Sequence, residues 1–144
     1  MNMSEYIIEN EIKGADLILI RGVPGSGKST YAKKHFPNHR HLEADQFHMK
    51  GGKYDWKPEN VKKSHDWCQK ETEAELDNDK KVVVSNTFTT LKEMTYYIEL
   101  AKKMNKKIKV LRMTTQFKNV HNVPEEVLEK MKKRFQDFTG EVKV

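Results

Sequence analysis

The chain has 144 residues, a length that suits one domain with a single buried core. Its one cysteine excludes an intramolecular disulfide framework and a zinc site built from several cysteines, and no apolar run approaches the roughly 20 residues that span a bilayer. The formal charge of +6 favours polyanions such as nucleic acid, although its dispersed lysines are equally typical of a solvated surface.

The first elements in chain order are a polar segment, a strand and a helix. Residues 1–15 carry no signal-peptide core and are expected to form an N-terminal extension, so that the domain would occupy residues 16–144. Leu17–Ile20 is a short apolar run that predicts a buried strand, and residues 30–36 predict a helix that ends before Pro37. With the low cysteine content, these features predict a cytoplasmic protein that does not enter a membrane.

Strands and helices alternate along the rest of the chain. Further strands are predicted at residues 39–43, 82–84 and 108–113, and helices at residues 58–77, 90–104 and 124–138. Residues 49–57 contain adjacent glycines and lysines and predict a mobile surface loop, whereas residues 141–144 leave room for a further short strand. The alternation predicts an α/β fold, with a parallel sheet of four or five strands covered by helices on both faces.

Three of the predicted helices have residues at helical spacing that are expected to face one side. In the helix at residues 58–77 they are Val61, His65, Cys68, Thr72 and Leu76. In the helix at residues 90–104 they are Leu91, Met94, Ile98 and Ala101. In the last helix they are Val127, Leu128, Met131, Phe135 and Phe138.

Residues 22–29 match the phosphate-loop pattern G-x-x-x-x-G-K-[ST] at every fixed position. The motif lies between a predicted strand and a predicted helix, so that backbone N–H groups and a helix N-terminus would surround one anion. Lys28 would place a charge on the β- and γ-phosphates of ATP, and the Ser29 hydroxyl would bind Mg²⁺. The predicted nucleotide-binding residues are Gly22, Pro24, Gly25, Ser26, Gly27, Lys28, Ser29 and Thr30.

Ligands of parallel α/β sheets bind beyond the carboxyl ends of the strands, where Asp45 and residues 85–87 are expected. Asp45 could accept the proton of an attacking hydroxyl or hold Mg²⁺, or it could cap a helix. Asn86 and Thr87 could bind the attacking group or cap the next helix. No aspartate follows the third strand, so the carboxylate found there in many phosphate-loop NTPases is missing and Asp45 would have to replace it, unless Ser29, the phosphates and water suffice.

Phosphoryl transfer also needs cations near the transferred phosphate. Lys118 is the candidate catalytic cation, with His121, Arg112 and Arg134 as further candidates, although each is equally compatible with a solvated surface charge.

Aromatic residues around Trp56 are interleaved with lysines, a pattern typical of a groove for a single nucleic-acid strand; the same rings could instead cover the edge of the core. His48 follows Asp45 by three residues and is a candidate substrate-binding residue, as is Trp56.

Four sequence blocks occur in a characteristic order: GVPGSGKST, HLEADQF, VVVSNTFTT and NVHNVP. They resemble the small P-loop kinases related to bacteriophage polynucleotide 5′-hydroxyl kinase, and more closely the AAA-domain branch of that group, which includes the kinase-like domain of certain ubiquitin-ligase-binding proteins. The resemblance implies a kinase-type P-loop NTPase fold that uses ATP and Mg²⁺ to phosphorylate 5′-hydroxyl ends of DNA or RNA. Lys28 and Ser29 match the loop lysine and hydroxyl, and Asp45 matches the general base.

The chain departs from this resemblance at four places. His48 stands where the polynucleotide kinases carry an arginine, and Asn86 stands in place of their aspartate. Ser85 replaces an aspartate that is common in the closer branch. The segment at residues 114–119 is shorter than the usual lid and has no arginine, and Lys118 lacks the bidentate fork of an arginine. Two other functions therefore stay open: a kinase of a small-molecule hydroxyl, such as a nucleoside or an antibiotic, and a non-catalytic module that binds ATP or nucleic acid.

Overall fold

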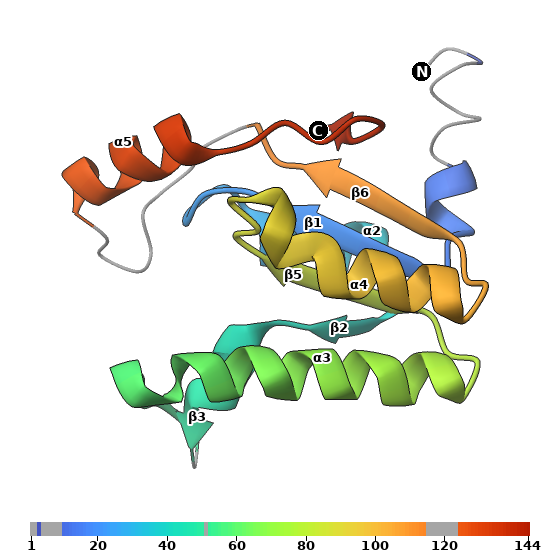
Figure 1. The fold of residues 1–144 in the computed structure, drawn as a ribbon, viewed down its shortest axis with the longest axis horizontal. Helices are drawn as coiled ribbons and strands as arrows, with labels where there is room; N and C mark the ends of the chain where they lie inside the picture. The colour runs from blue at the N-terminus through green and yellow to red at the C-terminus, as the bar shows by residue number, and fades with distance from the viewer. Residues whose placement is uncertain (1–2, 4–9, 51, 115–123) are drawn as a thin grey trace.

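The fold is a parallel sheet between two layers of helices, as the sequence predicts. A computed structural model describes residues 3, 10–50, 52–114 and 124–144. The sheet strands are β1 Leu17–Arg21, β2 Arg40–Leu42, β5 Val82–Asn86, β6 Ile108–Arg112 and β7 Val142–Lys143. They lie in the order β2-β5-β1-β6-β7, and every neighbouring pair is parallel. The strand that leads into the phosphate loop, β1, is therefore the central one (Figure 1).

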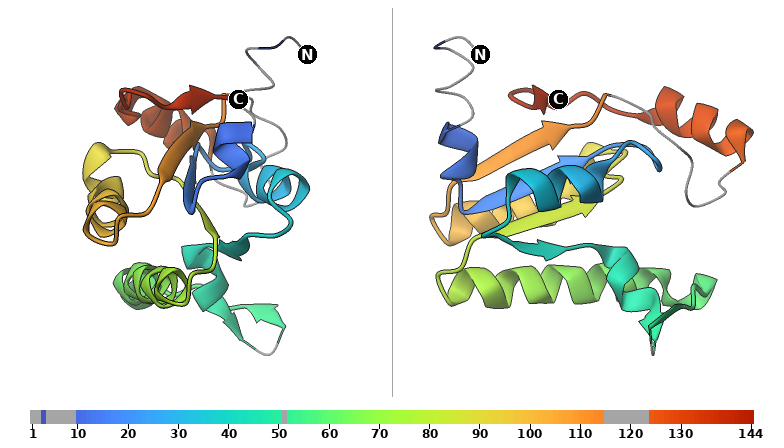
Figure 2. Two further views of the ribbon diagram at one scale, coloured as in Figure 1. Left: turned by 90° about the vertical axis from the view of Figure 1, so that its right-hand side faces the viewer. Right: turned by 180° about the vertical axis from the view of Figure 1, so that it is seen from behind.

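The helices cover both faces of the sheet. They are α2 Lys28–His35, α3 Val61–Asp77, α4 Leu91–Lys103 and α5 Glu125–Arg134, with 3-10 helices η1 at Ala44–His48 and η2 at Pro58–Asn60. The edge-on view in Figure 2 shows α3 and α4 on one face and α2 on the other. All strands run in the same direction, so their carboxyl ends meet at one edge, where the loop between β1 and α2 also lies.

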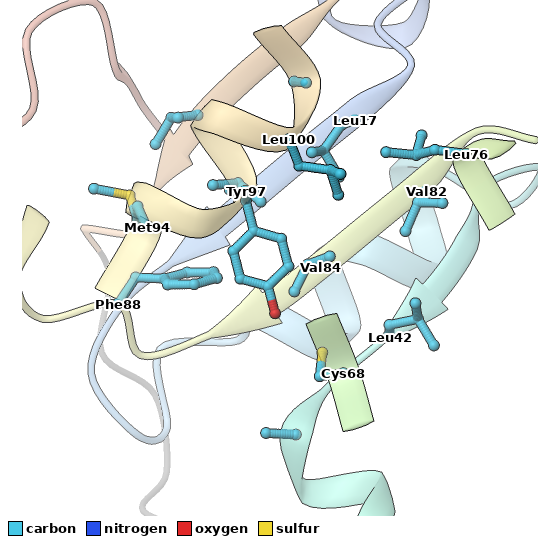
Figure 3. Packing of buried hydrophobic residues seen from close by; sticks show 14 residues of the cluster. Leu17, Leu42, Cys68, Leu76, Val82, Val84, Phe88, Met94, Tyr97 and Leu100 are labelled. Atoms are coloured by element: carbon cyan, nitrogen blue, oxygen red, sulfur yellow. The ribbon is translucent and has the colours of Figure 1, made fainter. Parts of the chain in front are cut away.

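Two apolar clusters fill the space between these layers. Successive residues of β1 point to opposite faces: Leu17 and Leu19 belong to the cluster under α3 and α4, and Ile18 and Ile20 to the cluster under α2. Figure 3 shows the first cluster, in which the Tyr97 ring lies among side chains from α3, α4, β1 and β5. Because β1 is buried on both faces, the position of the phosphate loop at its end is firmly fixed.

The described part of the predicted N-terminal extension contributes to the core. Residues 10–13 are helical, and Ile12 and Ala15 are buried in the cluster under α2. The boundary between extension and domain stays a prediction.

Four local expectations need correction. The predicted loop at residues 49–57 contains an antiparallel hairpin, formed by β3 Met49–Lys50 and β4 Lys53–Tyr54. In α3, Val61 and His65 are exposed, and Ser64 faces the core in their place. In α4, Leu91 is exposed as well, whereas Met94 and Ala101 are buried. The last helix ends at Arg134 instead of continuing to Phe138, and Val127 is exposed.

The segment after α5 returns to the sheet as β7, the short strand for which the sequence left room. Just before it, Glu141 pairs with Arg21, whose guanidinium is completely buried at the end of β1; their closest atoms are 2.9 Å apart. Arg21 also donates to the carbonyl oxygens of Phe88 and Thr89. The end of the described chain is thus tied to the strand that carries the phosphate loop.

Candidate functional site

The loop between β1 and α2 has the backbone conformation that its glycines predict. Gly25 and Gly27 have φ values of 80° and 86°, a region that favours glycine, and Gly27 is the N-cap of α2. A Cβ atom on Gly22 would lie 2.5 Å from Ser26 Oγ and 3.0 Å from Met113 Cβ, so that no larger residue fits there without a shift. The loop thus leads directly into the N-terminus of α2, a place where an anion is stabilised.

Lys28 lies folded over this loop. Its Nζ donates to the carbonyl oxygens of Gly22 at 3.0 Å and Val23 at 3.1 Å. Burial lowers the pKa of Lys28 to about 8, and the nearby carboxylates of Glu43 and Asp45 oppose that shift. A negatively charged ligand at the loop would favour the charged form of Lys28 and so oppose the effect of burial on its pKa.

A cavity of about 730 Å³ opens beside the loop. It brings together most of the predicted site residues, because the loop, η1 and the carboxyl ends of β2 and β5 meet at this edge. The predicted residues that line it are Pro24, Gly25, Gly27, Lys28, Ser29, Thr30, Asp45, His48, Trp56, Asn86 and Thr87.

Two predicted residues within the described ranges do not line this cavity. The N–H of Gly22, the first residue of the loop, donates to the carbonyl of Thr87, and Ser26 is buried. Lys118 lies outside the residues that the structure describes, as does His121. Arg112 lines a separate, smaller cavity, and its guanidinium pairs with Asp137 and Glu141 and lies over the ring of Phe135.

Asp45 is exposed at the mouth of the cavity, on η1. The Tyr54 hydroxyl of the hairpin donates to its Oδ1 at 3.2 Å. The 3-10 helix itself is held by Asn86, whose Oδ1 accepts the N–H of Ala44 at 3.0 Å. Asn86, predicted to bind substrate, thus also fixes the turn that presents Asp45.

Two aromatic residues near Asp45, His48 and Trp56, line the cavity, and we call them the aromatic wall. His48 is 3% exposed, and its ring lies within 6.4 Å of the rings of Phe47, Tyr54 and Trp56, measured between centroids. Trp56 is half exposed. Within the described part of the chain, His48 Nδ1 has no hydrogen-bond partner. This wall combines flat apolar surface with one unused polar atom.

Sequence reasoning overlooked Glu43, which follows β2 and lines the same cavity. The Ser29 hydroxyl donates to Glu43 Oε1, and so does Ser85 Oγ, at 2.9 Å; His41 Nε2 lies 3.0 Å from the same oxygen. Burial raises the pKa of Glu43, but these hydrogen bonds outweigh it and bring the pKa down to about 2. Glu43 is thus a carboxylate in direct contact with the predicted Mg²⁺-binding hydroxyl.

The comparison with known proteins identifies the family. The sequence profile of a family described as an AAA domain matches residues 17–138, from the start of β1 to the segment beyond α5. The chain belongs to the AAA-domain family. This agrees with the resemblance of the four sequence blocks, and the parallel five-stranded sheet is the P-loop kinase-type fold expected of that family.

The matches extend to relatives of very different length. NEDD4-binding protein 2 from Homo sapiens is 27% identical over 140 residues, which are 88% of this chain and 8% of that protein. A chain in a solved Pnkp1/Rnl/Hen1 complex superposes with a TM-score of 0.58 at 23% identity, covering 79% of this chain and 38% of that chain. This family member thus spans less than half of either protein.

A sugar kinase from Janibacter sp. HTCC2649 superposes with a TM-score of 0.58 at 15% identity, covering 90% of this chain and 83% of that chain. At these identities the two structural matches show the fold alone. The acceptor of this chain must therefore be argued from its own cavity.

Two further features of the described residues concern metal ions and membranes. In the described ranges, no group of three or more His, Cys, Asp or Glu side chains is placed to hold a metal ion by itself. No helix of the described residues is long and apolar enough to cross a membrane.

Proposed function

We propose that this protein transfers the γ-phosphate of ATP to a 5′-hydroxyl end of DNA or RNA, with Asp45 as the general base. The observation that carries the proposal is the single cavity that runs from the phosphate loop past Asp45 to the aromatic wall at His48 and Trp56. A phosphoryl donor and an acceptor need such a shared space, because their reacting atoms must approach to about 3–3.5 Å.

The donor side of the cavity fits a nucleoside triphosphate. The loop is shaped around Gly22 with no room for a side chain, and Lys28 stands over it with carbonyl groups as its partners. When the nucleotide binds, the Lys28 ammonium would donate to its phosphates in place of the two carbonyl oxygens.

Magnesium would sit beside Ser29, whose hydroxyl is the hard oxygen ligand that this ion prefers. Asp45, in the same cavity, is the second candidate from the sequence. When bound, the ion would neutralise charge on the β- and γ-phosphates.

The chemistry asked of the protein is one displacement. The acceptor hydroxyl oxygen forms a bond to the γ-phosphorus, the bond from that phosphorus to the β–γ bridging oxygen breaks, and ADP leaves with the bonding electrons. Asp45 takes the hydroxyl proton. The Tyr54 hydroxyl donates to one oxygen of this carboxylate and so restricts its orientation.

The acceptor side suits a nucleotide at the end of a strand. Trp56 offers half of its surface for stacking by a base. Lys53 and Lys57 flank it and are exposed, as expected of side chains that follow a phosphate backbone. The formal charge of +6 favours the approach of a polyanion.

A second candidate, a kinase of a small-molecule hydroxyl, is favoured by His48. Its buried Nδ1, unpaired among the described residues, suits one hydrogen bond to a hydroxyl or carbonyl. It lacks the two-pronged geometry with which an arginine grips a phosphate. The sugar kinase shows that this fold class serves small acceptors.

The decisive experiment supplies γ-labelled ATP with 5′-hydroxyl and 5′-phosphate oligonucleotides of DNA and RNA, and with a panel of nucleosides, sugars and aminoglycosides. We expect label on 5′-hydroxyl ends only, and none with Lys28→Ala. Label on a small acceptor alone would establish the second candidate. ATP binding without any labelled product would leave a non-catalytic binding module.

Asp45→Asn gives a sharper prediction for the general base. The amide cannot take the proton, so we expect the transfer rate to fall by at least ~100-fold, the lower end of general-base contributions. Calorimetry should find the affinity for ADP within about twofold of the unchanged protein. A transfer rate close to that of the unchanged protein would remove Asp45 from this role.

A further inference from the structure

We infer that Glu43 is the carboxylate on the metal side of the phosphate loop, and that Asp45 is thereby left to act on the acceptor alone. The inference rests on the proposed function, since it assigns a residue to the Mg²⁺ that accompanies the nucleotide. It changes the sequence-based expectation, in which Asp45 served both tasks.

The first argument is contact. The hydroxyl of Ser29, the expected Mg²⁺ ligand, donates to Glu43 Oε1. A carboxylate so placed can keep accepting from Ser29 when that oxygen binds the ion through its other lone pair, or accept from water on the ion. Asp45 is exposed instead, and its carboxylate accepts a hydrogen bond from Tyr54 and not from Ser29.

The second argument comes from sheet register. Leu42 pairs with Val84, so the next residues along these parallel strands, Glu43 and Ser85, lie side by side. Ser85 in turn pairs with Ile20 of β1, just before the loop. Ser85 has no carboxylate to offer Ser29. The longer side chain of Glu43 extends from the end of β2 and reaches the Ser29 hydroxyl.

The third argument is that the surroundings hold Glu43 in place. Ser85 Oγ donates to its Oε1 at 2.9 Å, and His41 Nε2 lies 3.0 Å from that oxygen and 2.6 Å from Ser85 Oγ. His41 and Ser85 are therefore positioning residues. Ser85 stands on β5 where a carboxylate would be expected. Its hydroxyl instead orients the carboxylate of Glu43, which follows β2.

The test measures metal affinity, without turnover. Mn²⁺ is titrated into the protein with saturating ADP, and free Mn²⁺ is followed by electron paramagnetic resonance. We expect Glu43→Gln to weaken Mn²⁺ binding by about 10- to 100-fold, the range typical of partners that orient a metal ligand. Asp45→Asn, which also removes one carboxylate from the cavity, should bind Mn²⁺ as the unchanged protein does.

A second variant guards against a loss of fold. In Glu43→Gln/Ser85→Asp, the carboxylate returns to β5, and Mn²⁺ affinity should recover at least partly. ADP affinity in the presence of EDTA, which needs no metal, should be the same in all variants and confirms an intact loop.

The outcomes separate this inference from the proposed function. Unchanged Mn²⁺ affinity in Glu43→Gln, or a loss in Asp45→Asn instead, overturns the assignment of Glu43 and leaves the kinase proposal standing. A protein that binds neither ADP nor Mn²⁺–ADP overturns both.

Discussion

Individual residues of the phosphate loop are constrained by space as much as by charge. Gly22 is the clearest case, because its missing side chain leaves room for Ser26 and for Met113. Any Cβ there pushes against two side chains whose own positions are fixed by buried backbone. The loop would move before the core did.

Gly22→Ala should therefore weaken ADP binding by at least about tenfold, equivalent to ~1.4 kcal/mol, as measured by calorimetry. The matched control is Gly14→Ala, since a Cβ on Gly14 meets its nearest atom, the Asn10 carbonyl oxygen, at an ordinary 3.4 Å. The control should keep its affinity. Equal affinities in the two variants would mean that the loop tolerates the added methyl group.

Residue identities could be predicted where a motif fixes the spacing. Lys28, Ser29 and Asp45 do line one cavity, as expected. Glu43 could not be found in this way, because no motif marks it and the sequence pattern assigns it to the predicted strand at residues 39–43. Its importance comes from the pairing of β2 with β5, which joins residues 42 positions apart.

Among the elements, η1 matters most for the proposed chemistry, because five residues carry both Asp45 and His48. Its first residue is tied to β5 through the Asn86 side chain, which accepts the N–H of Ala44. Since Ala44 is buried, loss of that acceptor leaves a backbone N–H without a partner.

Asn86→Ala is expected to lower the free energy of unfolding by ~1–3 kcal/mol, the range for an unsatisfied buried group. Asn78→Ala removes a carboxamide that bonds Ala74 at the exposed end of α3, and should change stability by less than about 0.5 kcal/mol. Urea denaturation of both variants measures the difference. A small effect for Asn86 would show that η1 holds its position without it.

Prediction of the elements succeeded where apolar patterns were long and failed where tertiary contacts decided. Ser64 is buried in α3 although it is polar, because its hydroxyl donates to the Val61 carbonyl at 2.6 Å. The last helix stops at Arg134 because Phe135 leaves it to lie against the guanidinium groups of Arg21 and Arg112. Strands of two residues, as in the hairpin, are too short to leave a pattern.

At the scale of the whole molecule, the buried pair of Arg21 and Glu141 joins segments 120 residues apart in sequence. Arg21 is fully buried and Glu141 is 5% exposed. Burial lowers the pKa of Arg21, and Glu141 opposes that shift. The guanidinium stays charged, so its partner cannot be removed without leaving a charge in the interior.

Glu141→Gln should lower the free energy of unfolding by ~3–5 kcal/mol, as is usual when one member of a buried pair is lost. Asp137→Asn is the control: its side chain is 85% exposed, so solvent screens its pairing with Arg112 and the substitution should change stability much less. Thermal and urea unfolding compare the two. Similar losses would indicate that Arg21 relies on the carbonyl groups of Phe88 and Thr89 instead.

The residues that line the large cavity include Pro24 of the phosphate loop and, 120 positions later in the sequence, Val144. Val144 is held there because its N–H donates to the Arg112 carbonyl. A ligand bound in this cavity would contact both of these regions, which separate when the sheet unfolds. Occupancy of the cavity would therefore stabilise the folded protein: tighter binding gives a higher melting temperature and slower amide exchange, including at β7, which directly precedes Val144.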